Sequence, residues 1–188
     1  MALYVPLGTL LHESGHILLA QLLGYKTQLH YASMDWYDAA MHPVSNAHDS
    51  FIITLGGNML LDLISIASLA TLLTMTARIR SWLYWVLVFL SMLIFRHILL
   101  TLIGIAMMVQ GHLLVSFGRD ESEISSYVHL PGLLLGWGLF LVSLASLYLL
   151  LFSVVKIEMR PRFFIAMCIG CPIGYGLWML WLGPLILP

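Results

Sequence analysis

The segment ALYVPLGTLLHESGHILLAQLLG, residues 2–24, is apolar except around the short motif LHESGH at residues 11–16. His12 and His16 are four residues apart, so on a helix their side chains lie on one face, one turn apart. Two imidazoles at this spacing can bind one tetrahedral zinc ion, and the adjacent carboxylate of Glu13 can take a proton from zinc-bound water. The pattern predicts a zinc hydrolase site on an apolar helix.

The composition places this site in a membrane. The chain has 188 residues, of which 61% are hydrophobic and 9% are charged, whereas soluble domains contain about 25% charged residues. We therefore expect a single transmembrane domain over residues 1–188, with the lipid bilayer and a membrane-protein or peptide substrate as partners. The formal net charge of -1 gives no electrostatic reason to expect a nucleic-acid partner.

The apolar runs predict an all-α polytopic membrane protein with a bundle of five or six transmembrane helices. A helix needs about 20 apolar residues to span the bilayer. Arg96 and His97 interrupt the longest run, which predicts two helices there, although one long bent helix is the alternative. The predicted spans cover residues 2–24, 51–75, 82–95, 98–117, 130–155 and 163–187.

Two polar segments separate these runs. Residues 25–50 form the longer one, and the loose alternation of residues 27–34 favours a short interfacial β-hairpin between the first two spans. Residues 118–129, GRDESEISSYVH, form the second polar segment. There Asp120 and Glu123 have the spacing of a helix N-cap and its capping box.

A catalytic zinc ion usually has three protein ligands and a water molecule. Placing the carboxylate of Glu13 at the centre of a spanning helix costs at least about 2.5–3.5 kcal/mol. This cost favours a metal ion beside Glu13. Asp120 is the leading candidate for the third ligand, because a helix N-terminus can present it toward the centre of the bundle; simple capping is the alternative. The other candidates are Glu121, Glu123, Asp62 and the histidines His30, His42, His48, His97, His112 and His129.

Small and polar residues in the apolar runs have two interpretations each. Gly56 and Gly57 allow another backbone to approach closely, or they break the helix. Asn58 can bind a substrate backbone or a developing oxyanion, or it can form a hydrogen bond between helices. Gly170 and Gly174 are four residues apart, the spacing at which small residues allow two helices to pack closely.

Two other functional classes compete with a hydrolase. One is a non-catalytic membrane scaffold that binds zinc and a partner. The other is a haem- or metal-binding membrane protein, for which His97 and His112 are candidate axial haem ligands. We expect the neighbouring Arg96 to extend its guanidinium group to a membrane interface.

HESGH in the first span, Gly56-Gly57 in the next and an acidic residue about a hundred positions later resemble the site-2 protease family of intramembrane zinc metalloproteases. The similarity covers residues 3–131 and is greatest to the small bacterial members. This chain has Asn58 where the family often has proline, and Asp120 lies between Arg119 and Glu121 rather than in a Leu-Asp-Gly context.

The resemblance implies that His12, His16 and Asp120 bind Zn²⁺ and that Glu13 is the general base of a peptidase. It also implies a metalloprotease core at residues 1–131, additional helices at 132–188, and an integral multi-pass protein of the bacterial cytoplasmic (inner) membrane. A homo-oligomer or a regulatory membrane partner is compatible with this interpretation. The predicted strand at residues 27–34 could pair with an extended substrate by β-augmentation.

Overall fold

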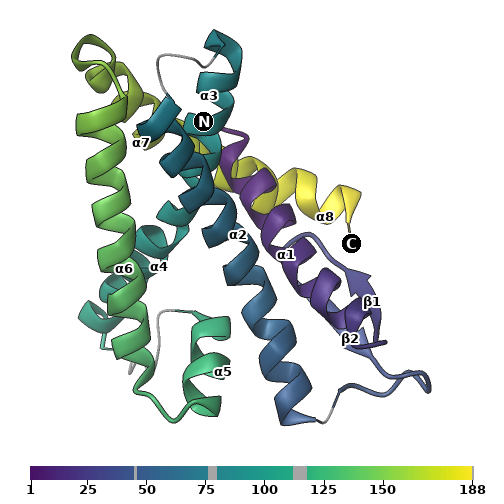
Figure 1. Ribbon diagram of the computed structural model, residues 1–188. Helices are drawn as coiled ribbons and strands as arrows, with labels where there is room; N and C mark the ends of the chain where they lie inside the picture. The colour runs from purple at the N-terminus through teal and green to yellow at the C-terminus, as the bar shows by residue number, and fades with distance from the viewer. Residues whose placement is uncertain (45, 76–79, 112–117, 188) are drawn as a thin grey trace. The chain divides into compact units, whose positions relative to one another are not determined.

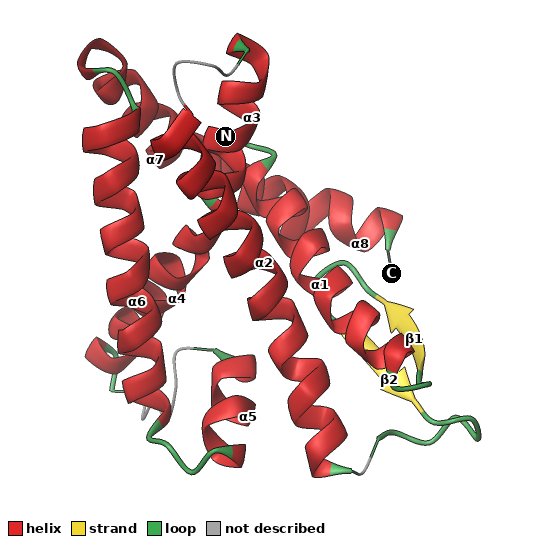
Figure 2. Cartoon of the chain, viewed as in Figure 1, coloured by secondary structure: helices red, strands yellow, loops and turns green. Residues whose placement is uncertain are grey.

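The computed structural model describes residues 1–44, 46–75, 80–111 and 118–187, which form two compact units. The first unit comprises Met1–Leu63 and Val155–Pro188, and the second comprises Ile64–Val154. Helices dominate both (Figure 1, Figure 2). The first unit contains α1 (Tyr4–Leu22), β1 (Lys26–Leu29), β2 (Met34–Tyr37), the start of α2 (Ala47–Met75), the 3₁₀ turn η4 (Ile157–Met159), α7 (Arg160–Leu177), the π turn η5 (Trp178–Leu182) and α8 (Gly183–Ile186). The second contains the rest of α2, α3 (Ser81–Ser91), the 3₁₀ turn η2 (Leu93–Phe95), α4 (Arg96–Val109), α5 (Arg119–Tyr127), α6 (Gly132–Leu149) and the π turn η3 (Leu150–Val154).

Helix α1 ends in a Schellman motif. Gly24 adopts a left-handed conformation with φ of 86°, which glycine reaches without a steric cost. The Tyr25 N–H donates to the carbonyl of Ala20 and the Gly24 N–H donates to the carbonyl of Gln21, so two carbonyls at the helix end are satisfied. This sharp ending turns the chain directly into β1.

Helices α1 and α2 cross at glycines. A Cβ atom added to Gly15 would lie 2.9 Å from the Cα atom of Gly57, and one added to Gly56 would lie 3.0 Å from the carbonyl carbon of Gly15. The two backbones are therefore in contact, as small residues permit between helices in an apolar environment. The expected close backbone approach at Gly56-Gly57 is confirmed.

The predicted hairpin between the first two helices is confirmed, with different strand boundaries. Strands β1 and β2 are antiparallel, with Lys26 opposite Tyr37 and Leu29 opposite Met34. The expected single strand over residues 27–34 is wrong, because residues 30–33 form the turn, where the His30 N–H donates to the Ser33 carbonyl at 2.8 Å.

The hairpin packs on both helices of the crossing. Met34 is buried in a cluster with Ala20 of α1 and Ile53 of α2. Partly buried side chains surround this cluster, namely Ile17, Tyr25, Leu29 and Trp36. Because a two-stranded sheet is at best marginally stable by itself, this packing is what holds the hairpin in place.

Helix α7 packs on the start of the chain. A Cβ atom on Gly174 would lie 2.9 Å from the Ala2 carbonyl carbon, and one on Gly170 would lie 3.1 Å from the Met1 carbonyl carbon. The predicted packing role of these two glycines is confirmed. The predicted last span, residues 163–187, differs from the structure, because the helix begins at Arg160 and widens into a π turn at Trp178–Leu182.

The long apolar segment of the second unit breaks earlier than the sequence predicts. The break lies at η2, and Arg96 and His97 begin α4 instead of separating two helices. The predicted position of the division is thus wrong: Arg96 and His97 lie in the first turn of α4, where carboxylates of α5 lie beside both side chains. At the break, Ser143 of α6 donates to the Ile94 carbonyl at 2.8 Å.

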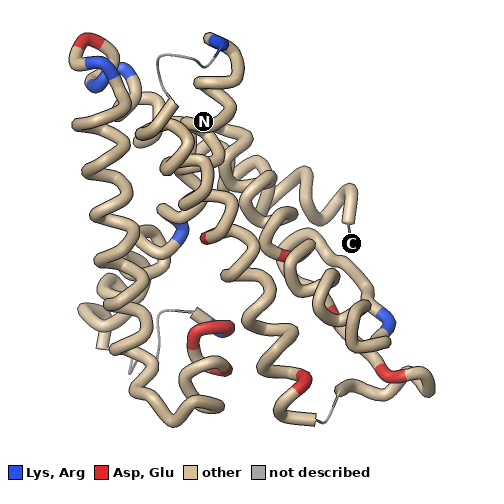
Figure 3. The backbone as a smooth tube through the Cα atoms, viewed as in Figure 1, with Lys and Arg blue, Asp and Glu red and all other residues tan. Residues whose placement is uncertain are grey.

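Four described helical segments are long and apolar enough to cross a membrane, by length and composition: Ala47–Met75, Ser81–Val109, Gly132–Val154 and Ile157–Ile186. The second of these joins α3, η2 and α4 in one segment of 29 residues, as in the alternative of a single bent helix. Helix α6 has no charged residue (Figure 3). The polar side chains of α1 lower its hydropathy, and the total of five or six spans stays a prediction.

We expect Gly174→Ala to lower the free energy of unfolding by about 1–3 kcal/mol, because the added methyl group would overlap the Ala2 backbone. Gly176 lies on the same helix with nothing within 4 Å of an added Cβ atom, so Gly176→Ala is the matched control. This control should be neutral or stabilising by about 0.5–1 kcal/mol. Denaturant unfolding in detergent micelles measures both; equal losses would contradict the assigned packing.

Candidate metal centre

Helix α1 buries His12, Glu13 and His16 together, with relative exposures of 4%, 6% and 3%. The Nε2 atoms of the two histidines are 3.0 Å apart. A tetrahedral zinc ion with Zn–N bonds of about 2.0–2.1 Å holds two nitrogen ligands about 3.3–3.4 Å apart. The predicted histidine pair is therefore formed, at a separation close to the one that a shared metal ion requires.

The other ring nitrogen of His16 is engaged by α2. His16 Nδ1 lies 2.7 Å from the carbonyl oxygen of Ile53. Because a carbonyl oxygen only accepts hydrogen bonds, Nδ1 carries the proton, and the Nε2 atom of the neutral ring presents a lone pair. Metal-binding histidines use this same arrangement, in which a backbone carbonyl fixes the tautomer and the ring orientation.

Gly57 provides the space that the two rings occupy. A Cβ atom at this position would lie 2.6 Å from the Cε1 atoms of both His12 and His16. A side chain here would therefore displace the imidazoles. The sequence indicated a close approach at Gly57 but not this role, because only the crossing of α1 and α2 brings Gly57 to the rings.

Trp36 is a second residue near the site that sequence reasoning did not identify. Its ring centroid lies 6.3 Å from that of His16, with the planes inclined by 31°. Strand β2 thus passes beside the histidine pair. The only signal in the sequence was an aromatic residue in the predicted interfacial loop.

Asn58 and Asp62 lie on α2. Asn58 directly follows Gly57 and is buried, with 5% exposure, whereas Asp62 is half-buried one turn further along the helix. Their spacing of four residues places them on one face of α2. The substrate-binding role of Asn58 and the ligand role of Asp62 stay predictions.

In the second unit, Asp120 does not cap α5. The N-cap residue is Gly118, which is extended with φ of -161°, and no side chain caps the helix. Asp120 lies in the first turn, where its Oδ2 atom is 3.8 Å from Arg96 Nη2. The capping alternative is therefore wrong for Asp120, because α5 begins earlier than the sequence predicts.

Glu123 has a different neighbour from the one predicted. Its Oε1 atom lies 3.5 Å from Arg119 Nε, in a pair four residues apart on the surface of α5. The predicted capping box with Asp120 is wrong for the same reason, since Glu123 is then a full turn inside the helix.

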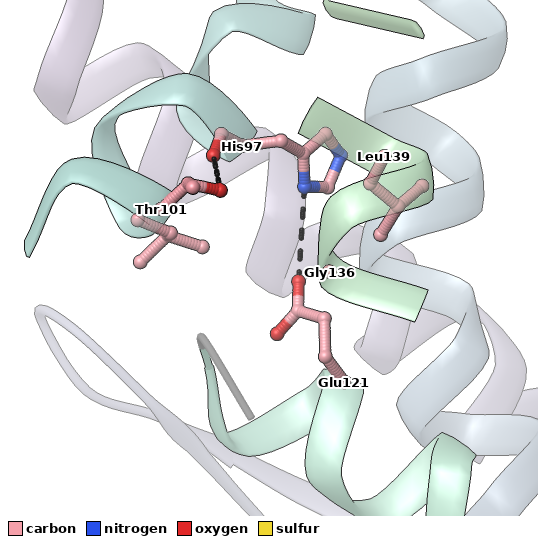
Figure 4. A pocket seen from close by; sticks show the side chains of 6 residues that line it. His97, Thr101, Glu121, Gly136 and Leu139 are labelled. Carbon is pink, nitrogen blue, oxygen red and sulfur yellow. Dashed lines mark hydrogen bonds and ion pairs between the residues drawn. The ribbon is translucent and has the colours of Figure 1, made fainter. Parts of the chain in front are cut away.

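Glu121 and His97 form a buried pair at a small pocket (Figure 4). Their side chains point toward one another, with 3.7 Å between Nδ1 and Oε1, and both are almost fully buried. Thr101 lines the same pocket and donates to the His97 carbonyl at 2.8 Å. Arg96 is 30% exposed and lies beside Asp120, and its extension to a membrane interface stays a prediction. The haem hypothesis stays a prediction, since His112 lies outside the described residues.

Further histidines lie on the hairpin and the loop after it. His30 Nε2 is 3.3 Å from Asp35 Oδ2, and His42 Nδ1 is 3.6 Å from Asp38 Oδ2. Backbone N–H groups, that of His42 first, donate to Asp38 and lower the pKa of its carboxyl group. His48 is exposed at the start of α2. His30 and His42 thus each have a carboxylate neighbour in the hairpin or the loop after it.

We expect Gly57→Ala to weaken zinc binding by at least about 10-fold while the protein still folds, because the added methyl group displaces flexible imidazole rings. Competition with a chelator in detergent micelles measures the affinity. Gly138→Ala is the control, since nothing lies within 4 Å of its added Cβ atom. Unchanged zinc affinity in Gly57→Ala would show that the ring positions described above are not those of a metal site.

Comparison of the chain with protein-family models, with curated proteins and with solved structures finds no match. A proposal for function therefore depends on the geometry of these residues and on the sequence motifs.

Proposed function

We propose that the chain is a zinc-dependent intramembrane metalloprotease that hydrolyses peptide bonds of membrane-associated substrates. The observation that carries the proposal is the orientation of His16. Its Nδ1–H group is committed to the Ile53 carbonyl, and its Nε2 lone pair faces His12 Nε2 at 3.0 Å. The glycine at position 57 leaves room for both rings, so the donor set fits a zinc ion.

Zinc, when bound, supplies a Lewis acid that polarises the scissile carbonyl group and makes water a better nucleophile at neutral pH. His12 and His16, whose Nε2 atoms face one another, are the residues that would hold the ion. Glu13 takes a proton from the attacking water as its oxygen bonds to the carbonyl carbon. The same carboxyl group then delivers the proton to the amine nitrogen as the C–N bond breaks. Glu13 is buried next to His12, so its carboxyl group is placed beside the residues that would hold the ion.

Asp120 is the third ligand under this proposal. The resemblance to the site-2 protease family assigns it, and its position in the first turn of α5 removes the capping role that competed with this assignment. The Arg96 guanidinium group near Asp120 Oδ2 favours the ionised carboxylate that a zinc ligand requires.

The hairpin is the proposed binding site for an extended substrate. A two-stranded sheet has main-chain groups along its outer edges that can pair with an added strand. Trp36 of β2 lies beside His16, so a peptide paired with the hairpin passes close to the histidine pair. Asn58, next to Gly57, is the proposed partner of the substrate backbone or of the developing oxyanion.

The proposed setting is the lipid bilayer of the bacterial cytoplasmic membrane. Four described apolar segments support the membrane itself, whereas the bacterial membrane follows from the resemblance alone.

Replacing the proposed base should separate chemistry from metal binding. Glu13→Gln should retain zinc and lose roughly 10²–10⁴-fold in hydrolysis of fluorescein-labelled casein in detergent micelles, since an amide cannot accept the proton. Zinc is measured by elemental analysis of the purified protein. Glu158→Gln, at an exposed position in η4, is the control and should behave as the wild type. Cleavage retained in Glu13→Gln would exclude Glu13 as the base.

Replacing the ligands should remove the metal. His12→Ala, His16→Ala and Asp120→Asn should each reduce zinc affinity by more than the roughly 10–100-fold that loss of an outer-shell partner costs. His42→Ala, with a side chain that is 77% exposed, is the control. Full zinc content in all three variants would defeat the proposal, and loss in the histidine variants alone would transfer the third-ligand role to another residue.

The competing classes give different outcomes in the same preparations. A zinc-binding scaffold is expected to contain zinc in the wild type and to hydrolyse casein no faster than Glu13→Gln does. A haem absorption spectrum without zinc is the result expected of the haem-binding alternative.

A further inference from the structure

The turn of the hairpin is held by the far end of the chain. The Tyr31 N–H donates to the Leu187 carbonyl at 3.1 Å, and the Tyr31 carbonyl accepts a hydrogen bond from Trp178 Nε1 at 2.9 Å. Both main-chain hydrogen-bonding groups of this turn residue are thus satisfied by the C-terminal segment. Backbone groups in exposed turns otherwise bond to water, so this arrangement is a specific attachment.

The C-terminal segment has a local shape that fits the turn. Trp178 begins the π turn η5, and it is buried, with 7% exposure. Gly183 follows the π turn, and a Cβ atom there would lie 2.9 Å from Tyr31 Cβ and 3.0 Å from Tyr31 Cδ2. The helix is thus irregular at the residue whose indole contacts the hairpin turn, and π turns are rare and often found at functional sites.

The attachment has a consequence for the histidine pair. The hairpin is fixed at its start, where Tyr25 Oη donates to Asp49 Oδ2 at 2.5 Å, and in its middle, where Met34 is buried. Tyr31 adds a third point of attachment at the turn. Three points determine the position of a short sheet, and β2 carries Trp36 beside His16.

We propose that the C-terminal segment of α7, η5 and α8 braces the hairpin, and that Trp178 is a positioning residue for the peptide strand that the hairpin receives. The role of Trp178 in positioning a peptide rests on the proposed function, whereas the brace itself does not. Trp178 touches neither the substrate nor the metal ligands in this mechanism. It acts through Tyr31, by holding the sheet at the distance and angle that bring an added strand to the histidine pair.

The variant Trp178→Phe keeps an aromatic ring and removes the Nε1–H donor. Trp181→Phe is the matched control, because Trp181 lies in the same π turn and is 60% exposed. Loss of one hydrogen bond should make the amides of residues 26–37 exchange roughly 2–10-fold faster in hydrogen–deuterium exchange. The KM for fluorescein-labelled casein in detergent micelles should rise by a similar factor, with kcat and zinc content unchanged.

The outcomes separate a positioning role from a structural one. Hairpin exchange at the wild-type rate in Trp178→Phe overturns the brace, and faster exchange with an unchanged KM overturns the positioning role. Should Trp178→Phe not fold, Gly183→Ala, whose added methyl group would crowd the Tyr31 side chain and the Trp178 carbonyl oxygen, is expected to give the same exchange and KM changes. If the wild type itself does not cleave casein, the proposed function fails, while the exchange comparison still decides whether the brace exists.

Discussion

The hydrogen bond from His16 Nδ1 to the Ile53 carbonyl is the contact on which the candidate site depends. It joins two helices in an apolar environment, where water does not compensate an unsatisfied polar group. It also decides which ring nitrogen carries the proton, and so turns the lone pair of Nε2 toward His12. The glycine contacts accompany it, since α1 and α2 cross with their backbones in contact at Gly15, Gly56 and Gly57, close to the His16 ring.

Each unit contains a small group of ionisable side chains that includes buried ones. In the first unit these are the residues of the HESGH motif, which lie at the crossing of α1 and α2. In the second unit, Arg96 and His97 at the start of α4 lie opposite Asp120 and Glu121 at the start of α5. Buried ionisable groups in an apolar environment require partners. In the second unit these partners come from a different helix, whereas in the first unit His16 pairs with His12 on its own helix and with the Ile53 carbonyl of α2.

The C-terminal helix is part of the same unit as the histidine pair. It packs through Gly170 and Gly174 on the first residues of the chain and through Trp178 on the turn of the hairpin. In the sequence it is an apolar run like the others, and its pattern predicted no role beyond packing. Its importance comes from its contact with Tyr31, whose main-chain N–H and carbonyl groups need hydrogen-bond partners.

The sequence by itself determined the features that depend on neighbours within one helix or one turn. The i, i+4 spacing of His12 and His16 fixes a shared helix face, the apolar composition fixes the helical class, and alternation in residues 27–34 indicated a hairpin. Only the tertiary structure decided the break at η2 and the roles of Gly57, Trp36 and Trp178. The reason is physical: these features depend on contacts between residues far apart in the chain, such as the 37 positions from His16 to Ile53 and the 147 from Tyr31 to Trp178, and local periodicity contains no information about such contacts.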